Sequence, residues 1–175
     1  MTRFTFFIIC ALLFFTNLNL LHAADDVTGL WIIPQEKTNK PSAYVLFYMY
    51  NEKLYGRMFV LLNPETGEVA DSMNTQIYRA ENLAGSPPLC GLDFIYEMQD
   101  RGREWRGTII DPSTGRLYDC SIRRDGTRMN VRGSLRGTMG LLGGNQTWLQ
   151  GSASDLPDDI IIPDANTITP VIPRR

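Results

Sequence analysis

The feature that most constrains this chain is a series of short alternating segments between Trp105 and Trp148. Within each segment apolar and polar residues alternate with period two, and turn residues such as those at 111–115 separate the segments. A period of two places neighbouring side chains on opposite faces of an extended strand. The pattern therefore predicts an antiparallel sheet with one buried face.

The same pattern reaches back to Gly29, and residues 29–150 show no sustained helical period. Short strands joined by hairpin turns favour a closed barrel, because closure removes the exposed sheet edges. We expect an all-β fold, a single antiparallel up-and-down barrel of about eight strands. After the opening segment at 29–31, the expected strands are 43–50, 54–62, 89–98, 105–111, 116–123, 128–134 and 147–150.

The first 23 residues have the pattern of a secretory signal peptide. Arg3 precedes an apolar stretch from Phe4 to Phe15, and the small residue Ala23 stands before the expected cleavage point. Such a stretch is too short to cross a bilayer, although an uncleaved N-terminal anchor is the alternative. We expect residues 1–23 to be removed, leaving a barrel domain at 24–150 that is periplasmic or extracellular and has no transmembrane segment.

Residues 151–175 differ in composition from the expected barrel. They contain four prolines and four aspartates, which predicts a disordered, flexible tail. Two short segments, 160–162 and 167–169, nevertheless have strand character. The alternative is therefore that the tail docks on a sheet edge as an added strand.

Several kinds of chemistry are excluded by composition and spacing. The chain's one histidine, His22, lies in the expected signal peptide, so the mature chain has no imidazole for a Ser-His-Asp system or a usual metal site. Asp93 and Glu97 share a strand face but stand about 13 Å apart, whereas glycosidase carboxylates need about 5–9.5 Å. We predict a non-enzymatic protein with no catalytic residues, no metal and no cofactor.

Cys90 and Cys120 form an even pair in an oxidising compartment, which favours a disulfide. The expected register pairs Tyr96 with Trp105 and Gly107 with Tyr118, and it puts the sulfur atoms about 20 Å apart along the strands. A disulfide needs Cα atoms within about 7 Å. Buried, unreactive thiols are the stronger expectation, and a disulfide is the alternative.

Positive charge is concentrated in residues 101–136, which hold nine arginines and no lysine. Export makes nucleic acid an unsuitable partner, and the polar face lacks interleaved aromatics for base stacking. Most of these arginines occupy outward positions, so a solvated face is expected. An anionic glycolipid or an acidic partner is the alternative, and the sequence indicates no particular protein partner.

The barrel interior is the candidate ligand site. Alternation points five bulky side chains inward, and they are expected to bound an apolar site: Met58, Phe94, Tyr96, Tyr118 and Met129. Gly56, Gly107 and Gly133 are expected to leave room on the same face, and the glycine-rich segment 137–144 forms either a lip at the mouth or a wide hairpin, which we favour. An eight-stranded barrel can be filled by side chains or hold one small ligand. Two functions therefore stay open, a binder of one small hydrophobic molecule and a filled barrel acting as an envelope structural or interaction module.

Several motifs together resemble a family of exported bacterial proteins known as domain of unknown function 2147. They are the segments 29–31, 54–57, 88–92, 105–118, 131–133 and 146–148. The resemblance implies a lipocalin-like barrel without a settled activity.

The resemblance also implies structural roles for six residues. The Gly29-Leu30-Trp31 opening is similar to the first lipocalin strand, where the tryptophan packs at the closed end against an arginine. Arg132 is the expected partner of Trp31. Trp105, Trp148 and the turn residue Asp111 complete the structural set.

Overall fold

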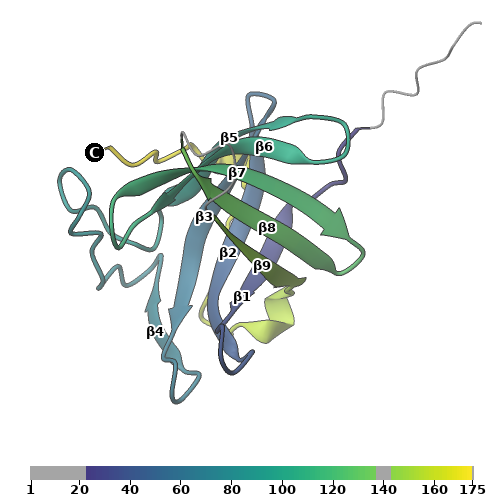
Figure 1. Cartoon of the computed structure of the whole chain (residues 1–175). Helices are drawn as coiled ribbons and strands as arrows, with labels where there is room; N and C mark the ends of the chain where they lie inside the picture. Colours follow the sequence, from purple (N-terminus) through teal and green to yellow (C-terminus); the bar gives the residue numbers. More distant parts are fainter. Residues whose placement is uncertain (1–22, 137–142, 175) are drawn as a thin grey trace, which may run out of the picture.

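The computed structural model describes residues 23–136 and 143–174. Residues 1–22 of the expected signal peptide and residues 137–142 of the expected glycine-rich lip or hairpin lie outside these residues. The described part contains nine strands: β1 (Gly29–Pro34), β2 (Pro41–Tyr50), β3 (Lys53–Leu62), β4 (Val69–Ser72), β5 (Asp93–Asp100), β6 (Trp105–Asp111), β7 (Arg116–Asp125), β8 (Arg128–Leu135) and β9 (Gly143–Gln150). Figure 1 shows their arrangement.

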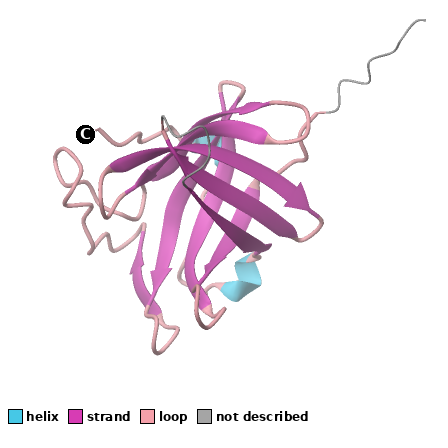
Figure 2. Ribbon diagram, viewed as in Figure 1, coloured by secondary structure: helices cyan, strands magenta, loops and turns pink. Residues whose placement is uncertain are grey.

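Eight of these strands close an antiparallel barrel. Strands β5 to β9 follow one another, β9 pairs with β1, β1 with β2, and β2 with β3, which pairs with β5 and so completes the circle. β4 pairs with the far part of β3 and stands outside the circle. The expected all-β, eight-stranded antiparallel barrel is therefore confirmed. Figure 2 shows that strands predominate over helices.

Among the described residues, no helix has the length and apolar character needed to cross a membrane. The helices that are described are two single turns after the barrel, η1 (Ala153–Asp155) and η2 (Ala165–Thr167).

In two hairpins the residues that pair across the strands differ from the expected ones. Trp105 pairs with Asp100 rather than Tyr96, and Gly107 pairs with Cys120 rather than Tyr118. The β5–β6 connection is shorter than expected because the amide of Arg101 donates to the carbonyl of Glu104 at 2.9 Å and closes a tight turn.

The N-terminal segment closes one end of the barrel. The indole nitrogens of Trp31 and Trp105 donate to the carbonyls of Val27 and Asp25, at 2.8 and 3.0 Å. Val27 is itself fully buried in the inner core. We call this the closed end; the 73–92 connection and the β6–β7 turn lie at the far end.

A second core lies on the outside of the barrel. It covers the outer faces of β1, β2 and β3, and its buried members are Leu30, Tyr44, Leu46, Tyr48, Tyr55, Phe59, Val60, Leu156 and Ile168. We call this group the outer cluster. Its last two members come from residues 151–174, which we call the C-terminal strap.

The described residues of the tail pack on the barrel, which differs from the expectation of a disordered, flexible tail. The strap starts at the end of β9, passes behind β2 and ends near the far end of the barrel (Figure 1). The apolar residues between its prolines pack on the outer aromatic face of β1–β3. This burial offsets the entropy cost of ordering a polar segment. The strap forms no added strand, so the edge-docking alternative is also not what the structure has.

Candidate functional site

The middle of the barrel is filled by aromatic rings. Trp148 on β9 lies with its ring centroid 6.1 Å from that of Phe47 and 6.4 Å from that of Phe94. Met129, which pairs with Trp148 across β8 and β9, is fully buried. Two expected ligand-site residues, Phe94 and Met129, therefore belong to the packed core at this level.

Tyr96 packs partly against both the inner core and the outer cluster, not on the inner face alone as expected. Arg57 pairs with Asp93 and Gly56 with Ile95, so β5 carries one extra residue at this point. A bulge of this kind reverses the alternation beyond it. Tyr96 consequently pairs with the outward residue Thr108.

Two of the glycines expected to leave room are instead close approaches. A Cβ on Gly107 would lie 2.6 Å from Met98 Sδ and 2.8 Å from Met98 Cα, and one on Gly56 would lie 2.9 Å from the Phe47 ring. Only at Gly133 would a Cβ meet ordinary contacts, at 3.8 Å from Ile109 and Tyr118. Tyr118 pairs with Ile109 and is partly exposed.

A hollow of about 360 Å³ lies at the far end of the barrel. Met58 on β3 lies in its wall, and Leu89 and Pro112 add apolar surface. Its polar lining consists of Arg79, Glu81, Asn82, Asp111 and Ser113. Of the five residues expected to bound a ligand, Met58 is the one that lines this hollow.

The β6–β7 turn that borders the hollow is rigidly built. Asp111 accepts hydrogen bonds from the Ser113 amide at 2.9 Å, the Ser113 hydroxyl at 2.6 Å and the Thr114 hydroxyl at 2.7 Å. Partial burial, the largest single influence, raises the pKa of Asp111, but the bonds from Ser113 and Thr114 outweigh it and the net pKa is lowered. Asp111 thus has the turn-forming geometry expected of it.

The connection that forms the other side of the hollow is organised by Asp71. This buried carboxylate accepts from the amides of Ile77 and Tyr78, both at 2.9 Å, and from the Thr75 hydroxyl at 2.8 Å. Burial alone would raise its pKa, but these bonds lower it below the ordinary value. Carboxylate–amide bonds of this kind order a loop that has little regular structure of its own.

The arginine over Trp31 is Arg124, not Arg132. The guanidinium carbon of Arg124 lies 5.6 Å from the centroid of the Trp31 ring, within cation–π range. Arg124 continues the inward positions of Cys120 and Ile122 to the closed end of β7, whereas Arg132 stands on the outer face of β8. The alternation in 116–125 could have identified it. Gly29, two residues before Trp31, has a φ of 105°, a conformation that favours glycine.

Cys90 and Cys120 are both buried free thiols. Burial raises the pKa of each to about 12, with Asp71 adding to the effect at Cys90. Neither thiol is therefore ionised near neutral pH, and thiolate chemistry is not available to them.

A buried ion pair that the sequence did not predict lies next to the outer cluster. Arg57 Nη2 lies 2.6 Å from Asp93 Oδ2, with 7% and 0% of the two side chains exposed. The Tyr48 hydroxyl donates to Asp93 Oδ1 at 3.0 Å, and the burial of Tyr48 next to this carboxylate strongly raises its pKa. The apolar run at 43–50 makes both faces of a strand apolar, and this pattern could have indicated a second, outer core.

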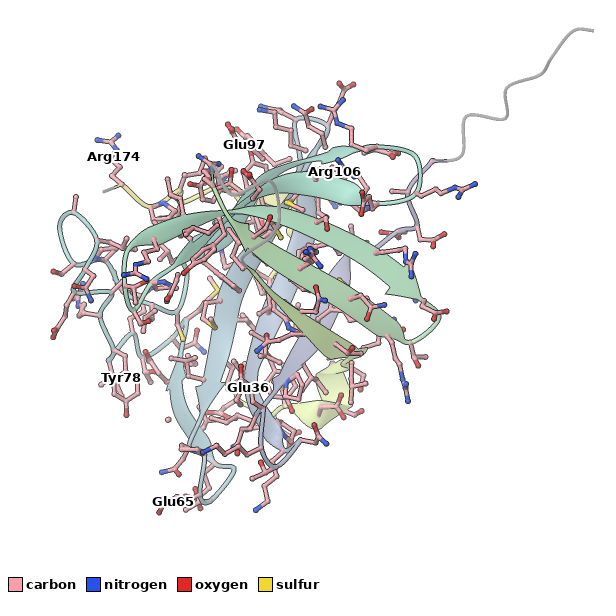
Figure 3. All side chains as sticks on the ribbon, in the orientation of Figure 1. Glu36, Glu65, Tyr78, Glu97, Arg106 and Arg174 are labelled. Atoms are coloured by element: carbon pink, nitrogen blue, oxygen red, sulfur yellow. The ribbon has the colours of Figure 1, made fainter. Side chains whose placement is uncertain are left out.

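The opposite side of the barrel has a shallow, charged groove. It has a volume of about 960 Å³ and follows the outer faces of β5 to β8. Glu97 and Arg106, which are labelled in Figure 3, are among the residues that line it. Acidic and basic groups are paired here, with Arg106 2.5 Å from Glu104 and Arg136 3.2 Å from Asp119. This is the geometry of a solvated mixed-charge face.

Comparisons with known proteins bear on the family and on the fold. A model of the family described as uncharacterised proteins conserved in bacteria, DUF2147, matches residues 29–150. A solved structure, protein HP1028 from Helicobacter pylori, described as belonging to the lipocalin family, is similar with a TM-score of 0.54 and 15% identity. That match covers 74% of this chain and 86% of the other. No curated protein matches the sequence significantly.

Proposed function

We propose, since the chain belongs to the bacterial family DUF2147, that it is an exported, non-enzymatic lipocalin-like barrel that binds one small hydrophobic molecule at the far end. The observation that carries the proposal is the hollow of about 360 Å³ beside Met58, Leu89 and Pro112. Small-molecule sites are concave, largely apolar and of about 300–1,000 Å³. The hollow is at the lower limit of that range, which restricts the ligand to a small one.

The polar lining favours a molecule with one polar group. Arg79, Asn82 and Asp111 surround the apolar wall, so an apolar body could pack on Met58 and Leu89 while its polar end meets these groups. The filled core around Trp148 excludes a ligand that runs the whole length of the barrel. The same filled core supports the second candidate, a barrel that acts through its surface as a structural or interaction module.

Binding of an apolar dye or a short fatty acid to delipidated protein tests the proposal. Leu89→Trp adds bulk in the wall of the hollow and should reduce binding at least tenfold. The matched control is Ile77→Trp, which places the same ring on an exposed site of the same connection and should bind as the parent does. Absence of saturable binding by the parent, or equal binding by both variants, would contradict ligand binding in the hollow and favour the interaction-module function.

Export is tested separately. N-terminal sequencing of the protein recovered from the bacterial envelope should begin at Ala24. Recovery of the intact N-terminus in the cytoplasm would contradict export without affecting the ligand-binding test.

A further inference from the structure

Next to the outer cluster, Arg57 and Asp93 bind main-chain atoms of the C-terminal strap. Arg57 Nη2 donates to the carbonyl of Thr169 at 2.6 Å. The amide of Val171 donates to Asp93 Oδ2 at 2.6 Å, and the amide of Asp93 donates to the carbonyl of Val171 at 3.0 Å. Arg57 and Asp93 therefore bind the backbone of the strap at residues 169 and 171.

Hydrogen-bond donors from the barrel and from the strap surround the carboxylate of Asp93. Its two oxygens accept from Tyr48, from Nε and Nη2 of Arg57, and from the strap. Tyr48 and Arg57 both belong to the barrel, and they contact each other, with Arg57 Nη2 3.1 Å from the Tyr48 hydroxyl. The strap supplies the remaining partner.

Side-chain recognition in this part of the strap is limited. Ile168 is buried among the aromatic residues of the outer cluster, whereas the side chains of Val171 and Ile172 are 49% and 40% exposed. One apolar anchor followed by main-chain hydrogen bonds is the arrangement by which proteins bind extended peptides of loosely defined sequence.

The residues that bind the strap lie inside the part of the chain that matches the family, and the strap lies outside it. Tyr48, Arg57 and Asp93 lie within residues 29–150, and the strap follows them. The site that binds the strap therefore belongs to the family barrel, and the segment that fills it is attached outside that barrel.

We propose that the outer face around Tyr48, Arg57 and Asp93 is a peptide-binding site, which residues 164–174 occupy in cis. A competing ligand is an extended polypeptide segment with a β-branched apolar anchor, like Ile168, and a free main-chain amide three residues later. Its affinity is lowered by the cis occupant, whose effective concentration is in the millimolar range for a short connection.

The test uses the full chain and a fluorescent peptide with the sequence of residues 164–174. Ile168→Asp removes the anchor of the cis strap and leaves the receptor unchanged, so this variant should bind the peptide at least tenfold more tightly than the parent. Val171→Asp, a change at a side chain that is largely exposed, is the matched control and should bind as weakly as the parent. A peptide N-methylated at the position of Val171 should not bind the Ile168→Asp variant, because it cannot donate to Asp93.

Equal peptide binding by the parent and a folded Ile168→Asp variant would overturn the proposal, as would full binding of the N-methylated peptide. If the Ile168→Asp variant does not fold, hydrogen exchange in the parent decides instead. The amide of Val171 should then exchange at least tenfold faster than the amides of β2 and β3, because the strap opens separately. Exchange of Val171 only by global unfolding would overturn the proposal.

Discussion

Two aspartate–arginine pairs stand on the outside of the same barrel in contrasting surroundings. The Arg57–Asp93 pair on β3 and β5 is covered by the strap and almost fully buried. The Arg136–Asp119 pair over β7 and β8 has 47% and 65% of its side chains exposed. The chemical groups are the same, and the cover over them differs. Their contributions to the free energy of unfolding should therefore differ several-fold.

The strands below the two pairs differ in the same way. β2 and β3 bury residues on both faces, with consecutive buried positions from Ala43 to Tyr48 and from Leu54 to Val60. β7 and β8 alternate buried and exposed positions. A strand that is apolar on both faces needs a layer on each side. The strap is that layer for β1–β3, and β6–β8 need none.

The largest expected effect comes from breaking the buried pair. Asp93→Ala leaves the Arg57 guanidinium buried without its carboxylate, so the free energy of unfolding should fall by about 3–5 kcal/mol. Chemical denaturation followed by tryptophan fluorescence measures it. A loss below about 1 kcal/mol would mean that Arg57 reaches water readily and that the pair resembles the exposed one.

Removing the strap's anchor should have a smaller effect. Ile168→Ala deletes buried apolar atoms, for which about 2–5 kcal/mol is usual in a rigid core. The loss should stay at the lower end, about 2 kcal/mol, because the strap can detach while the barrel remains folded. Hydrogen exchange should accordingly increase in residues 164–174 before it increases in β2. Uniform loss of protection would contradict separate opening.

The barrel itself could be predicted because its evidence is local. Alternation in 105–134 and the turns at 111–115 and 125–126 specify strands and hairpins without long-range information. The position of Tyr96 could not be predicted in the same way. One extra residue at Phe94–Ile95 displaces Tyr96 from the expected alternation, and a second register shift returns Met98 to the inner core. No turn residue marks these shifts in the sequence.

The candidate site was predicted less well than the fold. Side-chain alternation correctly identifies Phe94 and Met129 as inward residues, but it carries no information on what fills the space before them. Here Trp148 fills that space from β9. The strap was missed because its prolines and aspartates dominate its composition, whereas its docking depends on a few apolar side chains such as Leu156 and Ile168.

The third effect concerns the 73–92 connection, whose order depends on one carboxylate rather than on a covering layer. Asp71→Asn retains the shape but loses the charge that strengthens the bonds from Ile77 and Tyr78, so the free energy of unfolding at pH 7 should fall by about 1.5 kcal/mol. The pKa of Asp71 is lowered in the folded state from 3.8. Its contribution is therefore complete above that value and is lost as pH falls through the lowered folded pKa. Denaturation curves of parent and variant should converge below that range, and a constant difference down to low pH would assign the effect to packing.

The smallest expected effect is at the exposed pair, and it completes the contrast with Asp93. Asp119→Ala removes a carboxylate that lies 3.2 Å from Arg136 Nε in a solvated groove, and the free energy of unfolding should change by about 0.5 kcal/mol or less. Arg136 also donates to the Thr108 hydroxyl at 2.6 Å, so its guanidinium keeps a partner after the change. Raising the salt concentration from about 0.05 to 1 M shortens the screening length to about 3 Å and should remove the small difference between parent and Asp119→Ala. The same salt series should leave the loss caused by Asp93→Ala largely intact, because water and ions do not reach that pair. A salt-independent effect at Asp119 as large as the one at Asp93 would show that exposure does not set the strength of these two pairs.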